Sequence, residues 1–292
     1  MAAHLQNSYE ICTQITRSQA KNFYYAFITL PTHKRMAIYA VYAFCRYCDD
    51  LSDDKEIKNR SEQFVSLRKE LKQSIDGKLT NNPIMPALID TINKFEIPDS
   101  YFYELIDGVE MDLAKSRFIT FEELKEYCYK VASIVGLISI NIFGYKDAKA
   151  NQYAIDLGIA MQLTNIMRDL QEDSERDRIY IPQDEMAQFG YKETDMLNGQ
   201  INNNFRQLMQ FQVERARSYF DSGINLLDFL QDDAIGCTAI LHKLYSRILD
   251  RIEKKEYDVF SNRVSLTGFE KIMIMSRFFL ISIKNKINIT NR

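Results

Sequence analysis

Breaks in regular structure are so scarce in this chain that it can fold only into long helices with few turns. Its 292 residues include ten glycines and five prolines, about 5 % together, where an average protein carries roughly 12 %. All five prolines fall at the edges of periodic apolar segments, where a missing N–H and a fixed φ disturb a helix least. They are Pro31, Pro83, Pro86, Pro98 and Pro182. The predicted fold class is therefore all-α.

Apolar periodicity between these breaks predicts a series of helices and almost no strand. The helices are expected at residues 8–28, 34–51, 57–76, 84–95, 99–115, 121–143, 147–173, 201–230, 232–256 and 268–286. Charged and small polar residues predict loops at 52–60, 76–82, 174–178 and 189–204. No repeat, low-complexity tract or Gly/Ser linker divides the chain, so residues 1–292 are expected to form a single domain.

Charge and motif content exclude several classes of protein. A net charge of −3 provides no basic field for a nucleic-acid backbone, so no nucleic-acid partner is expected. Neither a P-loop nor a Rossmann glycine pattern occurs, so metal ions and side chains must hold any phosphate. The three histidines are too scattered to predict a zinc site or a histidine-based triad.

Cysteine usage and apolar segments bear on where the protein works. Five cysteines, an odd number, and no secretory signal at the start of the sequence favour a reducing cytoplasm. Cys45 and Cys48 form a C-x-x-C inside an apolar run, which we interpret as buried core thiols. The uncharged stretch Val131–Tyr145 is shorter than the ~20 apolar residues of a membrane span and predicts a buried helix. Residues 271–292 fit the closing helix of a bundle, with a membrane-surface helix as the alternative.

The first candidate site lies at the end of the apolar helix 36–48. At 100° per residue, Tyr42, Arg46, Asp49 and Asp53 fall on one stripe, with Asp50 beside it. Three carboxylates therefore share one patch near the core.

A second polar stripe ends the predicted helix 147–173. It consists of Gly158, Gln162, Asn165, Asp169 and Asp173, and the opposite face is apolar. Like charges at i, i+4 destabilise a helix by about 0.2–0.5 kcal/mol, and buried carboxylates need partners, so a positive charge is expected between the stripes. The alternative is that both clusters are solvated helix ends.

Oxygen donors without histidine or cysteine select hard cations such as Mg²⁺, which binds jointly with substrate phosphates. Five aspartates, one diphosphate and three Mg²⁺ nearly balance in charge, with Arg46 and Arg168 close by, so about three Mg²⁺ ions are expected. The sequence also holds 17 tyrosines and 18 phenylalanines, many on apolar helix faces. Aromatic faces stabilise cations by ~0.5–2 kcal/mol, so a dry aromatic pocket beside a metal–diphosphate cluster suits carbocation chemistry.

Three regions together resemble the squalene/phytoene synthase family: YAFCRYCDDLSD at 42–53, GIAMQLTNIMRDLQED at 158–173 and RIYIP at 178–182. Shorter matches are FYYAF at 23–27, YCYKVA at 127–132 and Tyr245, and the similarity runs from about residue 10 to residue 265. The resemblance implies an isoprenoid-synthase helical bundle whose two aspartate motifs face each other across a central cavity. It also implies a Mg-dependent prenyltransferase that condenses two identical prenyl diphosphates head to head.

The same resemblance implies roles for individual residues. The implied metal positions are Asp49, Asp50, Asp53, Asn165, Asp169 and Asp173. The implied diphosphate positions are Arg46, Gln162, Asn165, Arg168 and Arg178, and Tyr42, Tyr129 and Tyr245 match positions around the reacting carbons. Asp49, Asp53, Asp169, Asp173 and Tyr129 are the implied catalytic residues. Phe23 and Lys21 are implied substrate contacts, although SQAKN at 18–22 stands where the family often carries a serine-rich phosphate patch, and VAS at 131–133 replaces its usual Val-Ala-Gly.

The implied reaction passes through a cyclopropylcarbinyl diphosphate to a phytoene- or dehydrosqualene-type hydrocarbon, from geranylgeranyl or farnesyl diphosphate. Hydride from NADPH would give squalene instead, and early release would give presqualene diphosphate; the residues leave NADPH use open. One competing hypothesis is another Mg-dependent isoprenoid synthase, against which the context of Arg46 and Asp49 and the string of residues 162–173 argue. The other is a non-catalytic helical assembly factor, against which the intact aspartates argue. A hydrocarbon product also suggests peripheral membrane contact during release.

Overall fold

A computed structural model describes residues 2–20, 22–53, 59–78 and 80–276. Within these ranges every named element is a helix, and only two isolated bridges, Arg117 with Ile179 and Tyr145 with Leu230, resemble a sheet. This confirms the all-α prediction. The elements are α1 (Ala2–Gln19), α2 (Phe23–Phe27), α3 (Thr32–Asp53), α4 (Arg60–Ile75), α5 (Met85–Lys94), α6 (Ser100–Ala114), α7 (Phe121–Cys128), the π-helical turn η1 (Tyr129–Ser133), α8 (Ile134–Phe143), α9 (Ala150–Arg168), α10 (Leu170–Ser174), α11 (Gln183–Gln188), α12 (Glu193–Leu197), α13 (Asn203–Gly223), the 3₁₀ turn η2 (Ile224–Asp228) and α14 (Asp232–Lys254).

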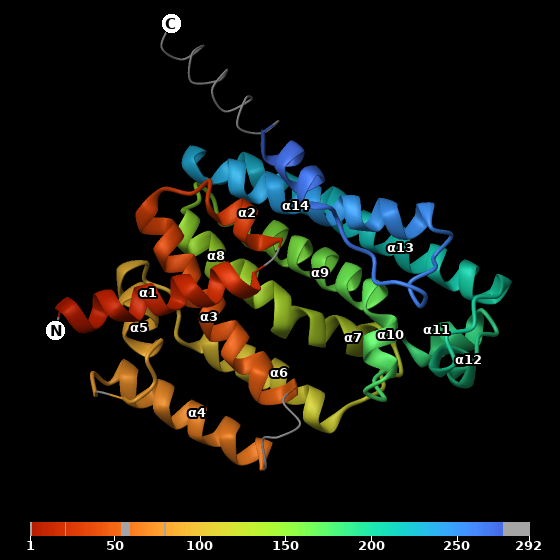
Figure 1. The fold of residues 1–292 in the computed structure, drawn as a ribbon, viewed down its shortest axis with the longest axis horizontal. Coiled ribbons are helices and arrows are strands. Elements are labelled where there is room, and N and C mark those ends of the chain that lie inside the picture. Colours follow the sequence, from red (N-terminus) through yellow and green to blue (C-terminus); the bar gives the residue numbers. More distant parts are fainter. Residues whose placement is uncertain (1, 21, 54–58, 79, 277–292) are drawn as a thin grey trace, which may run out of the picture.

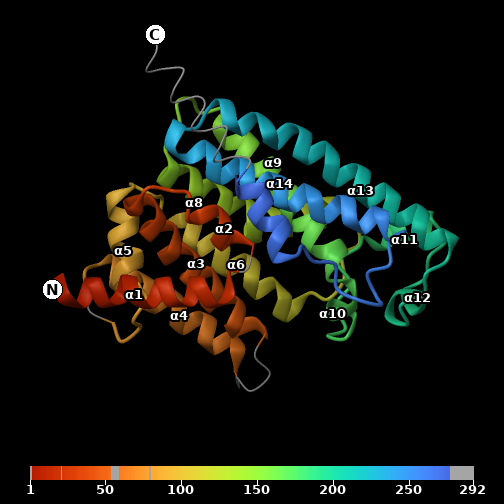
Figure 2. The same cartoon turned by 45° about the horizontal axis from the view of Figure 1, so that its top comes forward.

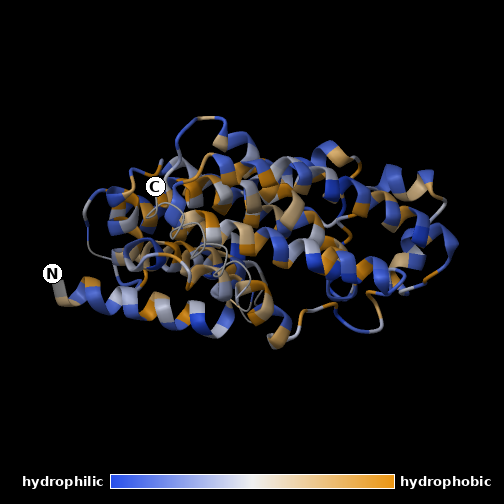
Figure 3. Cartoon of the chain, turned by 90° about the horizontal axis from the view of Figure 1, so that it is seen from above, coloured by the Kyte–Doolittle hydropathy of each residue, from blue (hydrophilic) through white to orange (hydrophobic). Residues whose placement is uncertain are grey.

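Helices α3, α8 and α9 form the inner part of the molecule. Helix α9 packs against α8, α13 and α14, while α3 packs against α1, α5 and α6. Helices α13 and α14 run side by side along one edge and α4 lies at the other (Figures 1 and 2). The buried residues are predominantly hydrophobic. Figure 3 shows hydrophobic and hydrophilic residues alternating along the helices.

The predicted helices differ from the observed ones mainly where a helix is interrupted. The predicted helix 8–28 is two helices, α1 and α2, and the predicted helix 147–173 is divided at Asp169, whose φ of −103° and ψ of 13° leave the helical region. The predicted helix 121–143 is continuous but contains η1. Two short helices were not predicted: α11, and α12 inside the predicted loop 189–204. Helices of five or six residues contain too few apolar repeats to be recognised by periodicity.

Local signals mark several helix ends. Thr120 caps α7 by accepting a hydrogen bond from the backbone N–H of Glu123, and Asn202 caps α13 through Phe205. Helix α8 ends at Gly144, whose φ of +76° is in the region that glycine adopts without strain.

One segment of the described chain, Phe121–Phe143, is long and apolar enough to cross a membrane by length and composition, with a mean hydropathy of 1.2. Half of this window is buried inside the protein, as expected for a core helix. The C-x-x-C is divided: Cys48 is buried, whereas Cys45 is half-buried and faces the internal cavity described below.

Candidate active site

A cavity of about 600 Å³ runs between α3, η1–α8 and α9 and is the centre of the candidate site. On α3 its lining extends from Ile38 to Ser52, about 21 Å at the rise of an α-helix, and on α9 from Ala154 to Arg168, an equal length. Both helices present apolar residues at one end of the cavity and polar residues at the other. The cavity therefore has a polar mouth and a deep apolar end.

Three residues of the first predicted polar stripe, on α3, line the polar mouth of the cavity. Tyr42, Arg46 and Asp49 line the cavity, one helical turn apart. Asp50 does not line it: its carboxylate is about half exposed and forms an ion pair with Arg46. The predicted metal-ligand role of Asp50 therefore does not agree with its position, because a residue adjacent to Asp49 points some 100° away around the helix.

The second aspartate stripe lines the facing wall. Gln162, Asn165 and Asp169 contact the cavity, and Asn165 Nδ2 donates to Gln162 Oε1 at 3.2 Å. Asn165 Oδ1 is buried and has no hydrogen-bond partner among the described residues. Asp169 Oδ1 accepts hydrogen bonds from Arg168 Nε at 2.8 Å and from Arg263 Nε at 2.9 Å.

Asp173 also lines the cavity, one turn beyond Asp169. The pKa of Asp173 is raised to about 7, first because burial removes its carboxylate from water and second because the charge of Asp169 is nearby; Arg178 opposes the shift. Arg178 lines the cavity and donates from Nη2 to the backbone oxygen of Asp112 at 3.4 Å. Burial and a neighbouring carboxylate therefore disfavour the charged form of Asp173.

Two further predicted substrate contacts, Phe23 and Tyr245, lie next to each other. Tyr245 is buried, and its hydroxyl interacts with Arg168 and Asn165. Phe23 lines the cavity with its ring 5.8 Å from the ring of Tyr245 and 6.2 Å from that of Tyr42. Lys21 and the side chain of Asp53 lie outside the described part of the chain.

Tyr129 does not reach the cavity. It is half-buried near Tyr101 and Glu104, whereas Tyr127 lies in the cavity wall. The two tyrosines are about 200° apart around the helix, so only one of them can face inward. The i, i+4 series that begins at Tyr127 and continues through Val131 and Val135 would have identified the inward residue.

Sequence reasoning missed a buried hydrogen-bonded group at the mouth. Tyr180 donates to Asp112 Oδ1 at 2.8 Å and Tyr127 donates to Asp112 Oδ2 at 3.1 Å, and all three residues line the cavity. Their burial raises the pKa of both tyrosines, so each hydroxyl keeps its proton. The two aspartate motifs were found because acidic residues recur four positions apart, and Asp112 has no acidic residue at that spacing.

The oxygen donors of the mouth fit Mg²⁺ bound together with a diphosphate. Within the described ranges no three His, Cys, Asp or Glu side chains converge on a metal site of their own. The unpartnered Asn165 Oδ1 and the raised pKa of Asp173 are nevertheless what an oxygen-ligated cation would relieve. Mg²⁺ usually takes one or two carboxylates and completes its shell with water and substrate phosphates.

An all-helical bundle with an apolar cavity and acidic groups at its mouth is typical of metal-dependent enzymes that act on the diphosphates of apolar chains. Residues 16–270 match the family model described as squalene/phytoene synthase. The chain belongs to the squalene/phytoene synthase family, as its motifs predicted. It is therefore a prenyltransferase of the head-to-head type, and Mg²⁺ dependence is general in the family.

Individual relatives agree with this assignment. The chain is 38 % identical to a phytoene synthase of Arthrospira platensis, over 92 % of this chain and 91 % of the relative. It is 39 % identical to a 15-cis-phytoene synthase of Synechococcus elongatus, over 92 % of each.

Solved structures show the same fold. A dehydrosqualene synthase with bound ligand superimposes with a TM-score of 0.87 at 29 % identity, covering 95 % of this chain and 97 % of that one. A squalene synthase from Alicyclobacillus acidocaldarius superimposes with a TM-score of 0.82 at 30 % identity, covering 88 % and 97 %. The predicted isoprenoid-synthase bundle is thereby confirmed.

Proposed function

We propose that this enzyme joins two molecules of geranylgeranyl diphosphate head to head and releases phytoene, without reduction. The observation that carries the proposal is one cavity whose polar mouth holds both aspartate motifs and whose depth is apolar. The phytoene synthases at 38 % and 39 % identity support the 40-carbon product over a 30-carbon one. We treat residues 1–292 as a single catalytic domain acting in the cytoplasm.

In the proposed reaction, the C–O bond of the first substrate breaks and leaves an allylic cation. The double bond of the second substrate attacks this cation, and loss of a proton closes a cyclopropylcarbinyl diphosphate. A second ionisation, a rearrangement and loss of another proton give the central triene. Two diphosphates and two protons are released for each hydrocarbon formed.

Side chains at the mouth have two tasks in this scheme. Asp49, Asp53, Asn165, Asp169 and Asp173 would hold Mg²⁺, which supplies positive charge to the departing diphosphate. Charge balance gives about three ions.

 The arginines beside them, Arg46, Arg168 and Arg178, would bind the diphosphate oxygens. The apolar wall excludes water, which would otherwise quench the cation.

Incubation with each substrate tests the proposal. Geranylgeranyl diphosphate and Mg²⁺ are expected to give a 40-carbon triene by chromatography and mass spectrometry, with the same yield whether or not NADPH is present. A 30-carbon product from farnesyl diphosphate alone, or a product that requires NADPH, would replace phytoene by dehydrosqualene or squalene. A longer diphosphate or a single-chain hydrocarbon would contradict head-to-head coupling itself.

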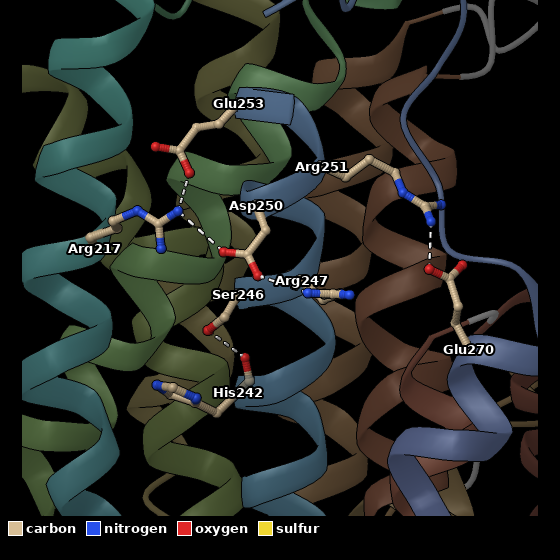
Figure 4. Close-up of polar contacts among 8 residues, drawn as sticks. All are labelled: Arg217, His242, Ser246, Arg247, Asp250, Arg251, Glu253 and Glu270. Atoms are coloured by element: carbon tan, nitrogen blue, oxygen red, sulfur yellow. Dashed lines mark hydrogen bonds and ion pairs between the residues drawn. The ribbon is translucent and has the colours of Figure 1, made fainter. Parts of the chain in front are cut away.

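We also propose that the product leaves into an anionic membrane on which the carboxyl-terminal part of the chain rests. After α14 the chain folds back, and a capping box starts a helix at residue 268: Thr267 N donates to Glu270 Oε2 at 2.8 Å, and Glu270 N donates to Thr267 Oγ1 at 3.3 Å. Arg251 on α14 forms an ion pair with Glu270 and holds this turn in place (Figure 4).

The outer face of this turn is apolar. Phe269, Ile272 and Met273, at i, i+3 and i+4, are 71 %, 56 % and 50 % exposed. Residues 271–292 contain five basic and no acidic residues, which complements an anionic surface. Transfer of a hydrocarbon product into water is unfavourable, so contact with a bilayer allows the product to pass from the cavity into the lipid.

Replacing Phe269, Ile272 and Met273 together by serine is expected to reduce co-sedimentation with phosphatidylcholine–phosphatidylglycerol vesicles at least about tenfold, since burying one apolar side chain contributes ~1.5–3 kcal/mol. A matched control replaces Val65, Leu197 and Ile224, which are exposed apolar residues elsewhere on the surface. Equal vesicle binding by both triple variants would contradict the proposed membrane contact, whereas a loss confined to the first would support it.

A further inference from the structure

At the deep end of the cavity, the termini of three helices meet around one buried ammonium group. Lys34, in the first turn of α3, donates from Nζ to the backbone oxygen of Phe143 at 2.7 Å and forms an ion pair with Asp233 at 2.6 Å. Phe143 is the last residue of α8, and Asp233 lies in the first turn of α14. The Lys34 side chain is 7 % exposed.

The chemistry of each helix end suits this contact. A free carbonyl at the carboxyl end of a helix attracts a cation, and an acidic side chain in the first turn stabilises a helix amino terminus. A buried ammonium group is costly unless it is paired and hydrogen-bonded, and here both partners are present. The Lys34 contact therefore holds α3, α8 and α14 in one relative position.

The residues beside this contact form the floor of the cavity. Phe143 itself lines the cavity, as do Ile38, one turn after Lys34, and Thr238, five residues after Asp233. The chain direction places them far from the aspartates, because Ile38 precedes Asp49 by about 16 Å along α3.

Backbone contacts stiffen the same end. Gln231 N donates to Gly144 O at 3.0 Å and Lys146 N donates to Phe229 O at 2.8 Å, which joins the end of α8 to the loop before α14. A Cβ on Gly144 would lie 2.8 Å from the Gln231 side chain, so the two segments are in close contact. These contacts make the floor of the cavity rigid.

We propose that the Lys34–Asp233 ion pair is a positioning device that seats Phe143 as the cavity floor and thereby limits the number of isoprene units that the enzyme accepts. The inference rests on the proposed prenyl diphosphate condensation and identifies what sets its chain length. An apolar pocket discriminates one methylene by about 10–200-fold, so a rigid floor can reject an added five-carbon unit, whereas a movable floor cannot.

A competition experiment tests this inference. Equal concentrations of geranylgeranyl diphosphate and its 25-carbon homologue are supplied with Mg²⁺, and the products are resolved by mass while total diphosphate release is measured separately. The wild type is expected to use the 20-carbon substrate almost exclusively. Phe143→Ala and Lys34→Met are each expected to raise the share of products containing a 25-carbon unit at least about tenfold relative to the wild type.

Control variants separate positioning from general destabilisation. Lys146→Met removes an exposed ion pair with Asp232 at the same end of the molecule, and is expected to leave the product ratio unchanged. Lys34→Met added to Phe143→Ala is expected to cause little further change, because both act on the same wall. If Lys34→Met does not fold, Asp233→Asn, which retains a hydrogen-bond acceptor, replaces it and is expected to shift the ratio in the same direction.

The outcomes distinguish this inference from the proposed function. An unchanged product ratio in folded Phe143→Ala and in the folded variant of the ion pair, with diphosphate release intact, would overturn the role of the floor alone. Failure of the wild type to release diphosphate from either substrate would overturn the proposed condensation instead.

Discussion

Replacing Asp49 or Asp169 by asparagine is expected to lower Mg²⁺-dependent diphosphate release by about 10²–10³-fold, the effect of removing one preorganised group that stabilises developing charge. Asparagine keeps the size of the side chain and removes the negative charge that an oxygen-ligated cation requires. Both carboxylates line the polar mouth, one on each wall of the cavity. Initial rates of diphosphate release at saturating substrate and increasing Mg²⁺ measure the loss.

Two further variants make this expectation specific. Asp50→Asn is expected to cost only about 10–100-fold, the range seen when a group that orients a ligand is lost, because Asp50 pairs with Arg46 outside the cavity lining. Asp221→Asn, on the exposed surface of α13, should leave the rate unchanged. Near-normal turnover in Asp49→Asn or Asp169→Asn would remove that aspartate from the mechanism, and equal losses in Asp49→Asn and Asp50→Asn would show that position in the stripe does not matter.

Much of the mouth could be predicted because its residues repeat along single helices. Arg46 and Asp49, or Asn165 and Asp169, are three or four residues apart, and helical geometry alone places such residues on one face. The same argument places Asp50 beside the stripe and cannot tell whether it points into the cavity. The structure decides this, because Asp49 lines the cavity and Asp50 does not.

Contacts between distant segments could not be predicted in the same way. Asp112, Tyr127 and Tyr180 come from three segments, and no spacing in the sequence relates them. The contact of Lys34 with Asp233 joins residues 199 positions apart. Hydrophobic periodicity describes which face of a helix is buried but does not say which helix covers it.

The division of α9 from α10 illustrates a third limit. The apolar and polar residues of 147–173 continue a helical pattern across Asp169, so periodicity predicts one helix. Asp169 instead ends α9 and accepts hydrogen bonds from Arg168 and Arg263, a residue from beyond α14. Tertiary contacts thus overrode the local pattern at a residue of the candidate site, where such conflicts are expected.

Replacing Gly158 by alanine is expected to destabilise the protein by at least about 1–3 kcal/mol, the usual cost of forcing extra atoms into a packed interior. Gly158 lies where α9 crosses η1, and a Cβ there would be 2.6 Å from Ser133 Cα and 2.8 Å from Ser133 N. These are backbone atoms, so the two helices must separate to admit the methyl group. Separation would also break the hydrogen bond from Ser133 Oγ to Ile155 O, which is 2.8 Å long.

The opposite sign is expected at Gly236, which gives a matched control. Gly236 lies inside α14 and a Cβ there meets no atom within 4 Å, so alanine should stabilise the protein by roughly 0.5–1 kcal/mol through its better helix propensity. Urea unfolding of both variants, followed by circular dichroism, measures the two free energies. The sign difference matters more than either magnitude, because helix propensity favours alanine equally at both positions. If Gly158→Ala were as stable as Gly236→Ala, the close approach of α9 to η1 would not be a constraint on the fold, and the cavity wall that these two elements form would tolerate larger side chains.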